Sequence, residues 1–96
     1  MLYARSLVPR LPYGLSTISA KKKIINSTEP TTGAVAVQDI YGDTGHVSVV
    51  TDVRWYKRVG GWQLSVTIKE ANYRPCRITV RRGSPASLGI VGFFKP

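Results

Sequence analysis

The only histidine of the chain, His46, stands where a glycine-rich loop gives way to a run of β-branched residues. An imidazole at such a junction is anchored by the sheet on one side and open to a cleft on the other. Glu70 and Asn72 stand two positions apart at the end of a later strand-like stretch. Because residues i and i+2 of a strand share a face, both side chains can approach one imidazole. Histidine with an acid or amide partner is the general base and orienting group of nucleophilic hydrolases.

No nucleophile in the sequence has an evident place beside His46. The single cysteine, Cys76, begins a strand-like stretch on the inward-facing set, with no helix start before it. Thiolates gain from the positive end of a helix dipole, so we interpret Cys76 as a buried, inert thiol. Asp43 and Asp52 are interpreted as loop and rim charges. The chain as written is therefore not expected to perform thiol chemistry.

Two short helices are expected ahead of the β segments. Residues 2–8 are interpreted as the end of a helix that stops before Pro9, because the residue preceding proline disfavours the helical conformation. Either Ser16 or Thr17 can cap a second, basic helix that runs through Ile25 and turns its three lysines toward solvent.

The remaining residues are predicted to form an antiparallel sheet of about five strands. The strand that begins at His46 is expected to place four apolar residues on one side, namely Val47, Val49, Val53 and Trp55. Helices followed by an antiparallel sheet indicate an α+β fold. The predicted strands cover residues 34–38, 46–56, 62–69, 76–80 and 90–94.

The strands of the central hairpin can pair in two registers. A five-residue loop pairs Tyr56 with Trp62 and brings His46 opposite Asn72. A tight turn at Gly60–Gly61 instead matches apolar residues with apolar residues across the hairpin. A slip of one residue exchanges the two faces of a strand, so both patterns hold together only with a bulge. We predict the register that brings His46 opposite Asn72, either with or without a bulge.

Composition limits the chain to one small domain. Its 96 residues leave no room for a second core. A single cysteine excludes an internal disulfide, and neither a membrane span nor a signal peptide is visible. The formal net charge of +9 favours a polyanionic partner, although a solvated basic surface explains the same charge. We predict no cofactor, no metal ligands and a monomeric state.

The ordered set of motifs resembles one known family. Gly45-His46-Val47 followed by Glu70-Ala71-Asn72-Tyr73 is similar to the CHAP domain, the cysteine, histidine-dependent amidohydrolase/peptidase module. Residues 30–37 resemble the family's strand before the histidine, and residues 89–96 resemble its last strand. Tyr3-Ala4-Arg5-Ser6 resembles the helix that follows the family's nucleophilic cysteine. The resemblance covers nearly the whole chain, from 1 to 96.

The resemblance implies a papain-like α+β fold and cleavage of amide bonds in peptidoglycan, at the bacterial cell wall. His46 would be the base that deprotonates a thiol, and Glu70 and Asn72 would orient its imidazole. The family's cysteine would fall just before Met1, so the chain is expected to be a CHAP-like domain truncated there and inactive as given. Peptidoglycan or another anionic cell-wall polymer is the implied partner.

Two other functions compete with this interpretation. A domain without a nucleophile could bind the cell wall through its cleft and positive charge without cutting it. A small basic β module could bind nucleic acid, but the cations are not interleaved with an aromatic platform, which makes this the weaker alternative. Three aromatic residues, Trp55, Tyr56 and Trp62, could stack on sugars, although cross-strand packing is the favoured interpretation.

Overall fold

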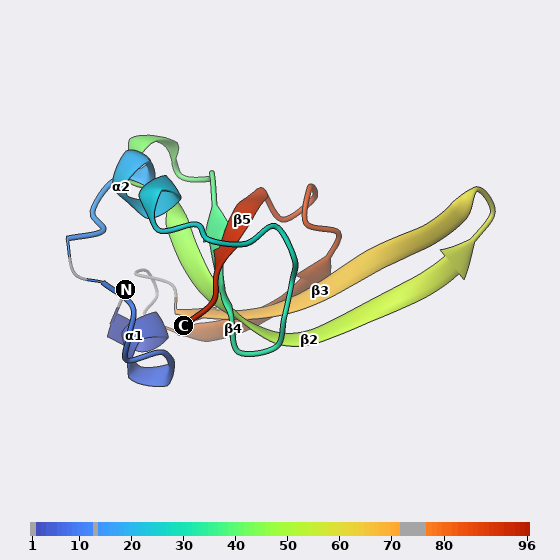
Figure 1. Cartoon of the computed structure of the whole chain (residues 1–96), viewed down its shortest axis with the longest axis horizontal. Helices are drawn as coiled ribbons and strands as arrows, with labels where there is room; N and C mark the ends of the chain where they lie inside the picture. The colour runs from blue at the N-terminus through green and yellow to red at the C-terminus, as the bar shows by residue number, and fades with distance from the viewer. Residues whose placement is uncertain (1, 13, 72–76) are drawn as a thin grey trace.

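Two short helices and one five-stranded antiparallel sheet form the fold in the computed structural model, which describes residues 2–12, 14–71 and 77–96 (Figure 1). The sheet has the strand order β4-β3-β2-β1-β5. This arrangement confirms the predicted α+β class and the number of strands. The elements are α1 (Leu2–Leu7), α2 (Ile18–Lys23), β1 (Val35–Gln38), the 3-10 helix η1 (Gly42–Thr44), β2 (His46–Arg58), β3 (Gly61–Ala71), β4 (Ile78–Gly83) and β5 (Ile90–Phe94).

Helix α2 carries a buried lysine that contradicts the prediction of three solvent-facing lysines. Thr17 caps the helix, because its Oγ1 accepts a hydrogen bond of 3.1 Å from the Ala20 amide. The Lys21 side chain is only 3% exposed. Its Nζ donates to the carbonyls of Leu15 and Thr44, each at 2.7 Å. The ammonium is tolerated there because it satisfies two backbone acceptors of the loops on either side of the helix.

The sheet separates two hydrophobic clusters. The cluster on one face combines the helices and the loop between them with β1 and β2, through Ala4, Val8, Leu11, Leu15, Val35, Val37, Val47 and Val49. The cluster on the other face lies under β5 and the segment before it, through Ala34, Ala36, Val50, Val66, Ile68, Leu88 and Phe93. Strand β1 contributes to both clusters and is buried over its whole length, as expected for a strand covered on both faces.

A β-bulge in β2 decides which side chains share a face. Val49 pairs with Lys69 in the predicted register, but the pairing shifts by one residue between Val50 and Asp52. Val53 therefore packs with the opposite cluster from Val49. The expectation that β2 keeps its four apolar residues on one side was wrong, because one extra residue exchanges the faces beyond it.

The hairpin end also differs from both predicted loops. Arg58 pairs with Gly61, which leaves Val59 and Gly60 as a two-residue turn. The predicted pairing of Tyr56 with Trp62 was wrong, since Tyr56 pairs with Gln63. Gly60 has a φ of +99°, which the third position of such a turn requires and glycine adopts readily.

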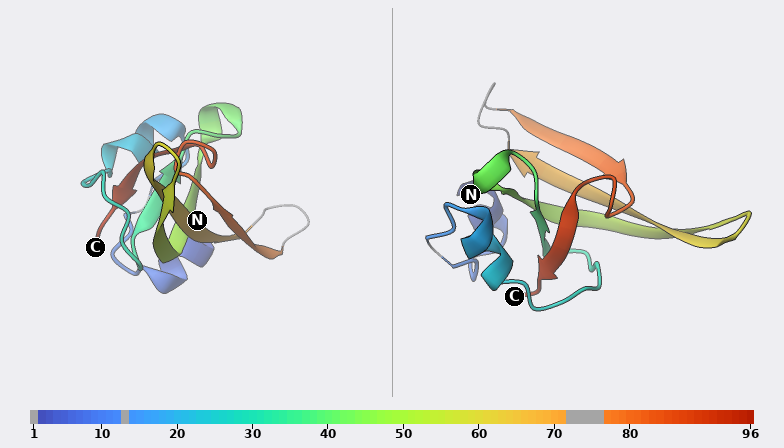
Figure 2. Two further views of the ribbon diagram at one scale, coloured as in Figure 1. Left: turned by 90° about the vertical axis from the view of Figure 1, so that its right-hand side faces the viewer. Right: turned by 90° about the horizontal axis from the view of Figure 1, so that it is seen from above.

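The outer half of the β2–β3 hairpin projects from the body of the protein. Figure 1 and the right-hand view of Figure 2 show the hairpin extending away from the two helices, and the molecule measures 42 × 29 × 25 Å. Trp55 and Trp62 on this projection are 60% and 64% exposed. Cross-strand packing, the favoured sequence interpretation, does not cover these rings.

Candidate active site

The loop ahead of β2 holds His46 at the start of its strand. Gly45 has a φ of +65° and lies so close to α2 that an added Cβ would stand 2.7 Å from Ile18 Cδ1. Lys21 binds the Thr44 carbonyl two residues before the histidine. His46 then pairs with Gln38 of β1. Helix α2 and strand β1 together fix the backbone that presents the imidazole.

The structure brings two of the three predicted site residues together. His46 Nε2 lies 2.6 Å from Glu70 Oε2, with side chains that are 17% and 2% exposed. The two residues come from the neighbouring strands β2 and β3. Asn72 lies outside the described residues, as does Cys76. The described site therefore contains a histidine whose Nε2 side is taken by a buried carboxylate.

Arg81, which the sequence analysis did not single out, is the second partner of that carboxylate. Its Nε lies 2.6 Å from Glu70 Oε1, and its Nη2 donates to Oε2 at 3.2 Å. Thr79, two residues earlier on β4, donates from Oγ1 to Oε1 at 3.5 Å. Strand β4 thus places a cation and a hydroxyl on the Glu70 side of the sheet, because alternate residues of a strand share one face.

The contacts among His46, Glu70 and Arg81, which we call the triad, are mainly electrostatic. His46 Nε2 and Arg81 Nε have no hydrogen-bond partner at normal angles, although both stand at ion-pair distance from Glu70. The Arg81 Nη2 contact has regular hydrogen-bond geometry. The attraction between His46 and Glu70 becomes fully ionic only when the imidazole is protonated. The carboxylate is consequently arranged to stabilise an imidazolium more than a neutral ring.

Burial determines the protonation of His46. Loss of solvent around the ring lowers the pKa of His46 below its ordinary value of 6.5, even though Glu70 acts to raise it, and the charge of Arg81 lowers it further. A neutral imidazole at pH 7 can accept a proton. Tyr41 meets the imidazole edge-on, with ring centroids 5.4 Å apart at 81°. The ring is therefore a base with one of its sides covered by Tyr41.

The geometry distinguishes the two ring nitrogens. Since Nε2 faces the carboxylate, we assign the proton of the neutral ring to Nε2. Nδ1 is then the nitrogen that carries the free lone pair, and it has no hydrogen-bond partner among the described residues. A nucleophile activated by this histidine would deliver its proton to Nδ1.

A buried hydrogen-bond chain fixes the neighbouring part of the same face. Ser48 Oγ donates to Gln38 Oε1 at 2.9 Å, and Gln38 Nε2 donates to the Leu88 carbonyl at 2.9 Å. Gln38 is the register partner of His46. The sequence analysis missed this pair and Arg81. The signal that could have found Arg81 is the alternation of β4, which turns Thr79 and Arg81 inward while Ile78 and Val80 stay exposed.

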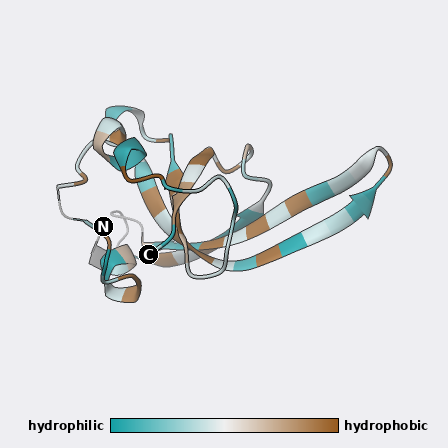
Figure 3. Cartoon of the chain, viewed as in Figure 1, coloured by the Kyte–Doolittle hydropathy of each residue, from teal (hydrophilic) through white to brown (hydrophobic). Residues whose placement is uncertain are grey.

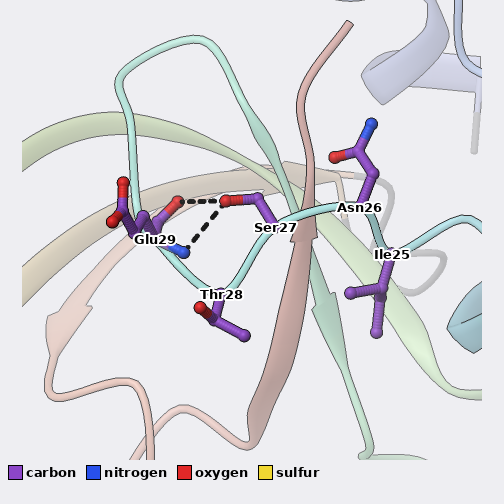
Figure 4. Close-up of a pocket in the computed structure, with 5 residues that line it drawn as sticks. All are labelled: Ile25, Asn26, Ser27, Thr28 and Glu29. Carbon is purple, nitrogen blue, oxygen red and sulfur yellow. Dashed lines mark hydrogen bonds between the residues drawn. The ribbon is translucent and has the colours of Figure 1, made fainter.

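A concave surface lies away from this site. It is a depression lined by residues 25–29 (Figure 4). Within it, Ser27 Oγ accepts from the Glu29 amide at 3.0 Å and reaches the Glu29 carbonyl at 3.4 Å. These are hydrogen bonds within one turn of chain, so the depression provides no set of groups that converge on a ligand.

Comparisons with protein-family models, with curated proteins and with solved structures give no match for this chain. No helix in the described part of the chain is long and apolar enough to cross a membrane. Within residues 2–12, 14–71 and 77–96, no three His, Cys, Asp or Glu side chains come together as a metal site would require.

Proposed function

We propose that the chain is the base-bearing part of a cysteine-dependent amide hydrolase of the CHAP type, acting on peptidoglycan. The observation that carries the proposal is the 2.6 Å contact between His46 Nε2 and the buried carboxylate of Glu70. A buried acid that holds one imidazole nitrogen leaves the other nitrogen for a nucleophile, which is the arrangement that thiol activation needs. The resemblance stated above adds the substrate class.

In this proposal His46 takes the proton of a thiol at Nδ1 and returns it to the leaving amine. Glu70 stabilises the imidazolium that forms between these two steps, because the charge pair then becomes complete. Arg81 and Thr79 hold the carboxylate so that one oxygen stays at Nε2. Asn72 is proposed as a second orienting group on the strength of the resemblance alone.

The thiol is assigned to the position immediately before Met1, as the resemblance implies. Helix α1 begins at Leu2 and packs against β2 and β3, the strands that carry the histidine and the glutamate. Ala4 and Val8 of this region join the cluster that includes Val47, whose side chain lies on the face of β2 opposite to that of His46. The position of the thiol therefore rests on the resemblance, and the contacts of α1 add only that this helix packs against both strands of the site.

Two proteins test the proposal on purified peptidoglycan, with released fragments identified by mass spectrometry. One is the chain as given, and the other carries a short N-terminal extension that ends in cysteine. We expect muropeptide release only from the extended protein, and its loss by at least a hundredfold in a His46→Gln variant of that protein. The matched control is Lys23→Gln, an exposed change on α2.

Three outcomes would contradict parts of the proposal. If the extended protein is folded by circular dichroism but releases no muropeptides, the proposed hydrolase function is wrong. Retained binding to peptidoglycan in that case would favour a binding module. Release by the chain as given, abolished by Cys76→Ser, would show that Cys76 is the nucleophile.

A further inference from the structure

The projecting part of the β2–β3 hairpin, residues 53–66, forms a surface that the proposed chemistry does not use. We refer to it as the arm. Its tip residue Val59 is fully exposed, and Trp55 and Trp62 are more than half exposed. Figure 3 shows hydrophobic residues alternating with hydrophilic ones along the arm, which extends beyond the helices and β5. Large exposed apolar side chains gathered in one place indicate an interaction site.

The register divides the arm into two faces of different character. Beyond the bulge, Trp55 pairs with Leu64 and Val53 pairs with Val66, so these side chains share one face. Trp62 lies on the same face, two residues from Leu64. Arg54 pairs with Ser65 and Tyr56 pairs with Gln63 on the opposite face. The arm is therefore an amphipathic ribbon with an aromatic face and a polar, basic face.

The charge of the arm has one sign. No acidic residue occurs between Asp52 and Glu70, whereas the same stretch contains Arg54, Lys57, Arg58 and Lys69. Arg54 is paired with Asp52 at 2.8 Å on the exposed surface. The two cations nearest the tip, Lys57 and Arg58, have no ion-pair partner among the described residues. The arm thus offers positive charge beside the exposed tryptophans.

We propose that the arm is a peripheral membrane-binding element that places its aromatic face in the interface of a bilayer rich in anionic lipids. Tryptophan side chains favour the boundary between headgroups and acyl chains, because the ring is apolar and its N–H can still bond to water or headgroups. Arg54 and Arg58 on the other face, and Lys57 beside Trp62, can extend to lipid phosphates while their stems stay on the apolar surface.

The face assignment favours a bilayer over single-stranded nucleic acid. A strand stacked on Trp55 and Trp62 needs phosphate-binding cations on the same face as the rings. Only Lys57, the register partner of Trp62, stands on that face of the arm, whereas Arg54 and Arg58 alternate to the other. A face of apolar side chains with a single lysine, opposite a face with two arginines, is the kind of distribution that an interfacial amphipathic element has.

The two tryptophans of the chain both lie on the arm, so tryptophan fluorescence, excited selectively over tyrosine, reports on this element alone. The whole chain is titrated with vesicles of phosphatidylglycerol and phosphatidylcholine, and separately with vesicles of phosphatidylcholine. We expect a blue shift of the emission with the anionic vesicles, weakened by salt, and little or none with the zwitterionic ones. Absence of a shift with anionic vesicles would overturn the proposal.

A charge variant with an equal-charge control tests the location of binding. Lys57→Gln with Arg58→Gln keeps both tryptophans as reporters and removes two cations from the arm. We expect its partition coefficient on anionic vesicles to fall about 30-fold, at about fivefold per cation. Arg10→Gln with Lys23→Gln removes the same charge from exposed sites away from the arm, and we expect a change within about threefold. Equal losses in the two variants would overturn the arm as the binding element.

Single-stranded oligonucleotide and soluble glycan fragments provide the competing occupants. The proposal predicts that neither changes the fluorescence at concentrations that match the accessible lipid. Tighter binding of oligonucleotide or glycan than of anionic vesicles would assign the arm to that ligand and overturn the membrane proposal. This experiment needs no hydrolase activity, so its outcome is independent of the proposed function.

Discussion

Replacing Arg81 with methionine tests how the buried carboxylate of Glu70 is held. The substitution keeps a long apolar stem but removes the guanidinium nitrogens at 2.6 and 3.2 Å from the Glu70 oxygens. At neutral pH the imidazole is uncharged, so the glutamate, which is 2% exposed, would lose its only permanent positive partner among the described residues.

The expected loss of unfolding free energy is about 2–4 kcal/mol. Breaking a fully buried ion pair costs about 3–5 kcal/mol, because the remaining charge is left unpaired. Arg81 is 40% exposed, so water can partly replace its guanidinium, and we expect a loss about 1 kcal/mol below that range. A domain of this size has a total stability of only about 5–14 kcal/mol, which makes such a loss easy to measure.

Urea denaturation at pH 7 measures the effect, with Arg82→Met as the matched control. Arg82 is the next residue on β4 and is exposed, and its Nε donates to the Thr67 hydroxyl at 3.1 Å. We expect its replacement to cost about 0.5–1.5 kcal/mol. In a Glu70→Gln background, Arg81→Met should lose much less unfolding free energy, because no buried charge is then left without a partner.

Nuclear magnetic resonance of His46 provides a second readout, since the chain has one histidine. Arg81 acts to lower the pKa of His46, so Arg81→Met should raise that pKa, whereas Glu70→Gln should lower it. Equal destabilisation by Arg81→Met and Arg82→Met, together with an unchanged His46 titration, would refute the assigned triad.

Three further predictions concern the elements around the imidazole. Because the pKa of His46 is lowered on folding, its contribution to stability should be fully present above pH 6.5 and decline as the pH falls below that value; urea denaturation between pH 7.5 and 5 should show this decline, and it should be smaller in His46→Gln. Gly45→Ala should lower the unfolding free energy by about 2 kcal/mol in thermal or urea denaturation, because a Cβ would meet Ile18 at 2.7 Å in a left-handed backbone conformation; an unchanged stability would contradict the close packing. Lys21→Met should cost about 2–3 kcal/mol, because two carbonyls lose their hydrogen-bond partner, whereas Lys22→Met at an exposed position should cost less than about 1 kcal/mol by the same denaturation measurement.

Local pattern was sufficient for most of the secondary structure. The final strand occupies Ile90–Phe94 as predicted, and Thr17 is one of the two predicted caps of α2. Alternation, turn formers and capping residues act over a few positions, so one sequence contains enough information to find these elements. Helix α2 nevertheless ends at Lys23 rather than Ile25, and η1 was not predicted.

The bulge in β2 is the clearest example of a feature that pattern did not determine. Val47 and Val53 are equally apolar, and only the pairing of β2 with β3 decides that an extra residue separates their faces. Each register satisfied part of the hydrophobic pattern, so the choice depended on the packing of two clusters on opposite sides of the sheet. Exposure of Trp55 and Trp62 follows from the same pairing.

The sequence by itself determined the α+β class, the order of the strands along the chain and the placement of a histidine and a glutamate at strand ends. Only the tertiary structure decided that His46 and Glu70 touch, that Arg81 holds the carboxylate and that Lys21 is buried beneath the histidine loop. The physical reason is distance along the chain. Local propensities act between near neighbours. The site instead joins β2, β3, β4 and helix α2, whose contacts exist only after the sheet has formed.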